Sequence, residues 1–191
     1  HAGFGEALPE LNPRLRKMMI YLGSSLGNFM RLELLGFLQQ VADGMGTGDY
    51  LLLGFDQLKD PAVLLRAYDD SQGVTRDFTL NAFLVLNRRL GTNFDPSRFR
   101  YRPHFNPDWS QVEMWVEAAQ DMTVRFPHSG LDLKFRSGDR ILVEISRKFR
   151  AEPLIQQLRS FHLPLMKRFG DEEDRFSLLL CRRARGLNTD G

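Results

Sequence analysis

The feature that most constrains the fold is a strand–helix–strand pattern between residues 17 and 56. Residues 17–22, KMMIYL, and residues 50–56, YLLLGFD, are continuous apolar runs of strand length. Between them, residues 32–45, LELLGFLQQVADGM, place apolar side chains at helical spacing, and Gly44 is a suitable helix end. Two strands joined through a helix over so short a stretch predict a βαβ unit and hence a parallel sheet.

The pattern changes in the next part of the chain. Residues 61–68 are predicted to form a helix, with Asp60 at its N-cap and Pro61 in its first turn. A second helix is predicted over residues 75–89. Its apolar face is expected to consist of Phe78, Leu80, Phe83, Leu84 and Leu86.

Alternating apolar and polar residues then dominate residues 99–135 and predict antiparallel strands. Residues 138–149 are expected to form a short extended piece or a helical turn, and residues 151–161 a helix. The final strand, residues 175–182, is expected to return to the first sheet. The predicted fold class is therefore α/β with an inserted α+β segment.

These patterns divide the chain into four parts. Residues 1–58 begin the α/β domain, and residues 59–148 form the insertion. Residues 149–184 return to the α/β domain, and residues 185–191 are expected to be a disordered tail. The insertion follows a strand of the predicted parallel sheet, and ligands of such sheets bind at the carboxyl ends of the strands. The insertion is therefore expected to be a substrate-binding lobe.

Composition limits the classes of partner. The formal net charge of +2 argues against nucleic acid as the main partner. No run reaches about 18 apolar residues, so no membrane-spanning helix and no membrane partner are expected. The single cysteine, Cys181, cannot form an intrachain disulfide, which favours a reduced, cytoplasmic setting. It lies in the strand-like run SLLLCRR and is expected to be a buried apolar residue rather than a nucleophile.

Two polar segments follow predicted strands, in the position where open α/β sheets bind ligands. They are residues 67–78, AYDDSQGVTRDF, and residues 23–29, GSSLGNF. Small residues in the second segment would let a ligand approach the backbone, and the Asn28 amide offers one acceptor and two donors. The alternatives are a tight turn capped by Asn28, and loop-capping roles for Asp69 and Asp70 in place of a catalytic carboxylate pair.

Other motifs do not indicate a site. Residues 44–49, GMGTGD, mimic a dinucleotide-binding glycine motif, but they close a predicted helix and precede a strand, so a turn is predicted. The four histidines lack the spacing of metal ligands, so no metal site is expected.

A combination of segments is more specific than any of these patterns. YLGSSLGNF, LLLGFDQLKDPAVLLRAYDDSQGVTRDF, VEMWV and EISRKF follow one another with nearly even spacing. Together they resemble the histidine-specific, S-adenosylmethionine-dependent methyltransferase family, whose best-known members make trimethylhistidine on the path to ergothioneine. The resemblance runs from residue 18 to residue 149, and more weakly to residue 182. It implies the carboxyl-terminal part of a class I, Rossmann-like methyltransferase sheet with an inserted α+β substrate-binding lobe.

The resemblance implies five substrate-binding residues. Asn28 and Tyr68 match the pair that holds the amino-acid carboxylate, and Met114 matches a residue that lines the side-chain pocket. Glu144 and Ser146 match the pair that hydrogen-bonds the imidazole. An imidazole N–H needs an acceptor, which a carboxylate supplies in a charge-assisted bond, and the other nitrogen can accept from a hydroxyl. Retention of this set favours histidine over indole-bearing substrates.

The implied cofactor is S-adenosylmethionine. Gly23 matches the glycine that closes a strand beside the substrate and the sulfonium, and Phe4, after Gly3, stands where the family has an Asp followed by Phe or Tyr near the adenine. Methyl transfer from a sulfonium depends mainly on positioning a neutral amine, so no catalytic acid or base is predicted. The family's glycine-rich loop and ribose-binding acid lie upstream of YLGSSLGNF and are not in this sequence. This polypeptide alone is therefore expected to bind the cofactor poorly, and its open sheet edge to favour self-association.

The predicted function is S-adenosylmethionine-dependent methylation of the α-amino group of histidine, or the substrate-binding portion of an enzyme with that activity. One alternative is a paralogue that methylates another aromatic amino acid or amine. The other is a non-catalytic binding module that has lost the cofactor half. A native reading frame with an upstream glycine-rich segment would favour a truncated enzyme, and a native start near His1 would favour the module.

Overall fold

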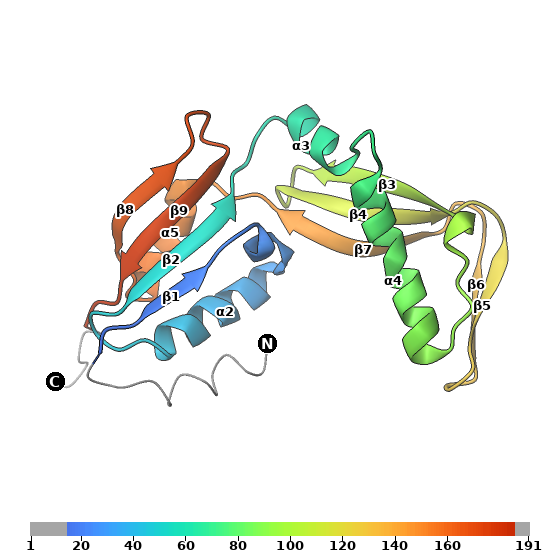
Figure 1. Ribbon diagram of the computed structural model, residues 1–191, viewed down its shortest axis with the longest axis horizontal. Helices are drawn as coiled ribbons and strands as arrows, with labels where there is room; N and C mark the ends of the chain where they lie inside the picture. The colour runs from blue at the N-terminus through green and yellow to red at the C-terminus, as the bar shows by residue number, and fades with distance from the viewer. Residues whose placement is uncertain (1–14, 186–191) are drawn as a thin grey trace. The chain divides into compact units, whose positions relative to one another are not determined.

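The computed structural model describes residues 15–185, so the predicted cofactor contact Phe4 and nearly all of the predicted tail lie outside the described residues (Figure 1). The chain divides into two compact units, residues 1–58 with 147–191, and residues 59–146. The predicted insertion extends two residues further than the second unit. Lys148 belongs to the first unit, where its ammonium lies 2.8 Å from the Asp56 carboxylate.

The first unit is built on a four-stranded mixed sheet in the order β1-β2-β9-β8. β1 and β2 are parallel, and β9 is antiparallel to both of its neighbours. The predicted parallel pair and the return of the final strand are therefore confirmed. No strand is predicted at β8, whose side chains are all exposed or half-buried. The strands are β1 (Met18–Tyr21), β2 (Tyr50–Asp56), β8 (Leu165–Gly170) and β9 (Phe176–Arg182).

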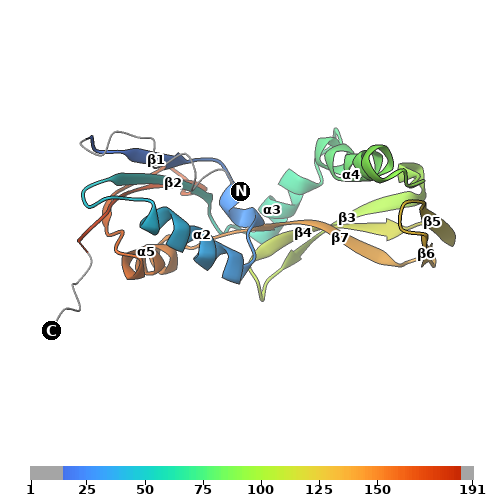
Figure 2. The ribbon, with the colours of Figure 1, turned by 90° about the horizontal axis from the view of Figure 1, so that it is seen from below.

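Two helices cover one face of this sheet (Figure 2). They are α2 (Arg31–Asp43), which follows the short helix η2 (Ser25–Asn28), and α5 (Ala151–Ser160). Alternate residues of β2 and β9, such as Leu53 and Leu179, pack against them, as does Leu38 of α2. Cys181 is part of the same core, as predicted, and burial raises the pKa of its thiol to about 12.

The edge strand β1 keeps apolar side chains exposed. Met18, Ile20 and Leu22 are 52%, 59% and 52% exposed, whereas Met19 between them is buried. These three side chains alternate along the chain and therefore share one face of the sheet. Among the described residues, β1 has a strand neighbour on one side only, which is β2.

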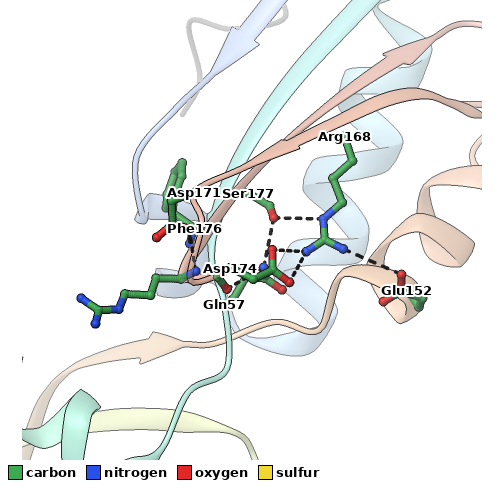
Figure 3. A network of polar contacts seen from close by, with 8 residues as sticks. Gln57, Glu152, Arg168, Asp171, Asp174, Phe176 and Ser177 are labelled. Carbon is green, nitrogen blue, oxygen red and sulfur yellow. Dashed lines mark hydrogen bonds and ion pairs between the residues drawn. The ribbon is translucent and has the colours of Figure 1, made fainter.

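The loop between β8 and β9 is held by a polar network (Figure 3). The Arg168 guanidinium donates to the carboxylate of Asp174 and, at 3.2 Å, to the hydroxyl of Ser177. The Gln57 amide donates to the same hydroxyl at 3.1 Å and to the Asp174 carbonyl at 2.8 Å. The network therefore ties the hairpin to the residue that directly follows β2.

The second unit carries two further sheets and two helices. β3, β4 and β7 form one sheet, and β5 and β6 form the other. The helices α3 and α4 contact the first of these sheets and lie on one side of it in Figure 2. The elements are α3 (Pro61–Tyr68), α4 (Val74–Leu90), η3 (Pro96–Arg98), β3 (Phe99–Asn106), β4 (Gln111–Ala118), β5 (Met122–Phe126), β6 (Leu131–Phe135) and β7 (Arg140–Arg147).

The core of this unit is aromatic. Phe83 of α4 stacks on Phe94 with ring centroids 4.5 Å apart and lies at the same distance from Phe99 of β3. The predicted apolar face of α4 is partly wrong, because Phe78 and Leu84 are 67% and 46% exposed. Only a part of this long helix packs on the sheet. The segment predicted as a short extended piece or a helical turn contains an eight-residue strand, β7.

Candidate functional site

In the first unit, the candidate residues lie just beyond the carboxyl end of β1. Gly23 has a positive φ of +83°, a conformation that glycine adopts without strain, and it turns the chain into η2. A Cβ built on Gly23 would have one neighbour within 4 Å, the Ser25 hydroxyl. Among residues 15–185, the Gly23 backbone is therefore open to the approach of a ligand.

Asn28 ends η2 and lines a pocket of about 600 Å³. The pocket has an aromatic wall, in which Phe37 of α2 lies 4.8 Å from Tyr21 and 4.9 Å from Phe29, measured between ring centroids. Burial raises the pKa of Tyr21, so its hydroxyl stays protonated. The exposed amide of Asn28 is thus placed at the mouth of a largely apolar cavity.

In the second unit, α3 positions Tyr68. The helix begins as predicted, with the Asp60 carboxylate accepting from the Ala62 N–H at 2.7 Å, and Tyr68 is its last residue. The Tyr68 hydroxyl donates to the Ser146 hydroxyl oxygen at 2.7 Å. Two predicted site residues that are 78 positions apart in the sequence are therefore in direct contact.

Glu144 and Ser146 both lie on β7, two residues apart, so their side chains leave the same face of an extended strand. Ser146 is buried and Glu144 is half-buried. Met114 is buried on β4 opposite Pro103 of β3. The second unit thus contains four of the five predicted substrate-binding residues. Asn28 belongs to the first unit, and its partnership with Tyr68 stays a prediction.

The carboxylate of Asp70 has a structural role. It accepts from the backbone N–H groups of Gln72, Val74 and Thr75 at 3.0 to 3.1 Å and so begins α4. The bond from the Thr75 N–H is the largest of several that lower the pKa of Asp70. The loop-capping alternative therefore describes this residue, and a catalytic pair with Asp69 is not needed to explain it.

Sequence reasoning did not identify Tyr101 of β3. Its hydroxyl donates to the backbone carbonyl oxygen of Tyr68 at 3.1 Å. Phe99, Tyr101 and Pro103 alternate with exposed residues in FRYRPHFN and therefore share the inner face of β3. This alternation was the signal in the sequence that Tyr101 points toward the helices.

Sequence reasoning also did not identify a buried carboxylate, Glu113 of β4. Glu113 accepts from side-chain N–H groups of Asn106, Gln111 and Trp115 at 2.8 to 2.9 Å. Burial opposes ionisation of Glu113, but these donors hold its pKa below the usual value. The cluster fixes the β3–β4 hairpin, next to Met114 in the sequence.

Residues 15–185 contain no group of three or more His, Cys, Asp or Glu side chains arranged to hold a metal ion. None of the helices in that range is long and apolar enough to cross a membrane.

The GMGTGD segment is a turn, as predicted. The Asp49 carboxylate organises it by accepting from the Gly46 N–H at 2.8 Å and from the Lys17 N–H at 2.9 Å.

The fold is that of an α/β protein with an inserted lobe, and that lobe contains four of the five predicted substrate-binding residues. A family model described as "Histidine-specific methyltransferase, SAM-dependent" matches residues 1–183. The chain belongs to this family of S-adenosylmethionine-dependent methyltransferases. The family resemblance and the α/β fold class predicted from the sequence are confirmed.

Curated relatives agree with the family. The chain is 36% identical to the "Histidine N-alpha-methyltransferase" of Mycolicibacterium smegmatis over 94% of this chain and 56% of that protein. It is 31% identical to "Ergothioneine biosynthesis protein 1" of Schizosaccharomyces pombe over 71% of this chain and 18% of that protein. It is 23% identical to the "L-tryptophan methyltransferase trpM" of Psilocybe serbica over 93% of this chain and 50% of that protein. The chain thus spans about half the length of the Mycolicibacterium smegmatis and Psilocybe serbica relatives, which it matches over more than 90% of its own length.

Proposed function

We propose that the protein containing this chain transfers a methyl group from S-adenosylmethionine to the α-amino group of histidine. The 36% identity to a histidine N-alpha-methyltransferase supports this function. The observation that carries it is the 2.7 Å bond between the hydroxyls of Tyr68 and Ser146. It joins the residue proposed to hold the substrate carboxylate to one proposed to hold the imidazole.

The hydrogen-bonding capacities of these groups suit histidine. Glu144 would accept from one imidazole N–H, and the Ser146 hydroxyl would donate to the other nitrogen. On substrate binding, Tyr68 would turn its hydroxyl proton from Ser146 to the substrate carboxylate, and Ser146 would turn its own proton to the imidazole nitrogen. Met114 would line the apolar part of the side-chain site.

We assign S-adenosylmethionine as the cofactor, and Gly23 fits a backbone contact with it because its Cα is open to approach. The cofactor supplies an activated methyl group on a sulfonium. Asn28 and Tyr68 would hold the substrate carboxylate and thereby fix the direction of the amine. Such positioning can lower a barrier by several kcal/mol, about 7 to 11 in well-oriented cases, without a catalytic acid or base.

Methyl transfer by the full-length protein tests this proposal. Histidine is expected to be methylated at its α-amino group with a kcat/KM at least about tenfold above that for tryptophan, because an indole leaves the carboxylate and hydroxyl imperfectly paired. Mass spectrometry of the products and initial rates with each amino acid measure both quantities. A preference for tryptophan would favour the paralogue alternative, for which the Psilocybe serbica relative is the specific observation. Binding of histidine without methyl transfer would favour the binding module.

We also propose that the 191-residue polypeptide alone self-associates through the β1 edge, where apolar side chains at Met18, Ile20 and Leu22 are exposed. Ile20→Lys would place a charge in that contact and is expected to convert dimers or larger species to monomers. Leu32→Lys is the control, since Leu32 is equally apolar and 79% exposed but lies on α2. Light scattering at increasing concentration checks this, and a monomeric parent polypeptide would contradict it.

We propose a cytoplasmic location and no nucleic-acid or membrane partner. The single cysteine, which cannot form an intrachain disulfide, and the net charge of +2 support this setting. Fractionation of cells that express the full-length protein measures it directly.

A further inference from the structure

Tyr101 contacts the end of the helix that carries Tyr68. The Tyr101 hydroxyl donates to the carbonyl oxygen of Tyr68 at 3.1 Å, while the Tyr68 hydroxyl donates to Ser146 at 2.7 Å. One residue is thus held at its backbone by Tyr101 and at its side chain by Ser146.

The carbonyl that Tyr101 binds belongs to the last turn of α3. The last four carbonyls of an α-helix lack partners within the helix and need donors from elsewhere. Immediately beyond Tyr68 the helical geometry ends, because Asp69 has φ −116° and ψ 58°. The Tyr101 bond therefore holds the carbonyl of the final helical residue at the point where the chain leaves α3.

Tyr101 is itself held firmly. It lies in β3 opposite Val116 of β4, which is fully buried. Burial, and then the charge of Asp69, raises the pKa of Tyr101 to about 12, so the hydroxyl keeps its proton at neutral pH. Tyr101 thus links the sheet to the end of α3 as a permanent donor.

We infer that Tyr101 is a positioning residue that sets where the Tyr68 hydroxyl stands in the substrate site. The inference rests on the proposed function, in which Tyr68 holds the carboxylate of the amino acid. Without the Tyr101 hydroxyl, the last turn of α3 loses a hydrogen-bond donor. The backbone of Tyr68, which sets the position of its ring, is then held less firmly. The affinity for the amino acid is the quantity that should change most, and the rate of methyl transfer should fall with it to a smaller extent.

Tyr101→Phe in the full-length protein tests this inference, since it removes the hydroxyl and keeps the ring. The KM for histidine is expected to rise about three- to tenfold, the range for loss of one neutral hydrogen bond. The kcat should fall by about two- to threefold, because a displaced carboxylate also turns the amine away from the methyl group, and the KM for S-adenosylmethionine should not change. Tyr50→Phe, a hydroxyl removal on β2 of the other unit, is the matched control and should leave all three values unchanged.

A double-mutant cycle separates positioning from a general effect on stability. In a Tyr68→Phe background, Tyr101→Phe should raise the KM for histidine no further, because the hydroxyl that it positions is already gone. A further rise of the same size in that background would overturn the inference, as would an unchanged KM in the single variant. If Tyr101→Phe lowers the melting temperature, calorimetric titration of histidine well below the transition measures the affinity of folded protein. If the parent protein does not act on histidine, the proposed function fails first, and the inference fails with it.

Discussion

Glu144→Ala is expected to lower kcat/KM for histidine by about 100-fold in the full-length protein. The change removes a charge-assisted hydrogen bond, which is worth about 1.5–3 kcal/mol, and leaves an imidazole N–H without this acceptor in a half-buried site. Glu144→Gln keeps the shape and an acceptor oxygen but loses the charge, so it should fall between the parent and the alanine variant. Initial rates over a range of histidine concentrations give these values.

The comparison with tryptophan makes this prediction specific. Glu144→Ala should lower the rate with tryptophan by less than about threefold, because the interaction lost is one that the imidazole makes. Asp132→Ala is a suitable control, since Asp132 is an exposed carboxylate on β6 of the same unit. Equal losses with both amino acids would mean that Glu144 supports the fold of the site and does not select histidine.

Asp56→Ala is expected to reduce the free energy of unfolding by about 3 kcal/mol, near the lower end for breaking a buried ion pair. The Asp56 carboxylate lies 2.8 Å from the Lys148 ammonium, whose side chain is fully buried, whereas that of Asp56 is 19% exposed. Nearby, the Phe149 N–H donates to the Asp56 carbonyl and the Leu58 N–H to the Phe149 carbonyl. The pair therefore stabilises the place where the chain leaves the first unit and returns to it.

A second variant separates the ion pair from general packing. Lys148→Met removes the buried charge but keeps much of the volume, and such replacements are often nearly neutral when both charges are removed. The double variant with Asp56→Ala should therefore be more stable than Asp56→Ala alone. Urea denaturation followed by circular dichroism measures all four proteins, with similar m-values as the check that the unfolding transition is unchanged. A double variant that is less stable than Asp56→Ala would contradict this account.

Much of the local structure followed from the sequence. The bounds of β2 and α3 agree with their predicted ranges, because a continuous apolar run and an Asp-Pro helix start are signals contained within a few residues. The structure differs where burial depends on distant partners. Phe78 is apolar at helical spacing but exposed, and β8 has too few buried side chains for its pattern to be recognised.

The candidate site also contains residues that the sequence identified and one that it did not. Asn28, Tyr68, Met114, Glu144 and Ser146 were identified from the sequence through the family resemblance. Tyr101 was not, because a tyrosine in an alternating strand has no local mark of function.

By itself, the sequence determined the family and elements such as β2 and α3, since their signals lie within short segments. Only the tertiary structure decided that β9 lies between β2 and β8, that Tyr68 bonds to Ser146, and that Tyr101 holds the end of α3. The physical reason is that the contacts of Tyr68 with Ser146 and Tyr101, and the pairing of β9 with β2, join residues 33 to more than a hundred positions apart. Their geometry is set by the packing of helices on sheets, and no short segment of the sequence contains it.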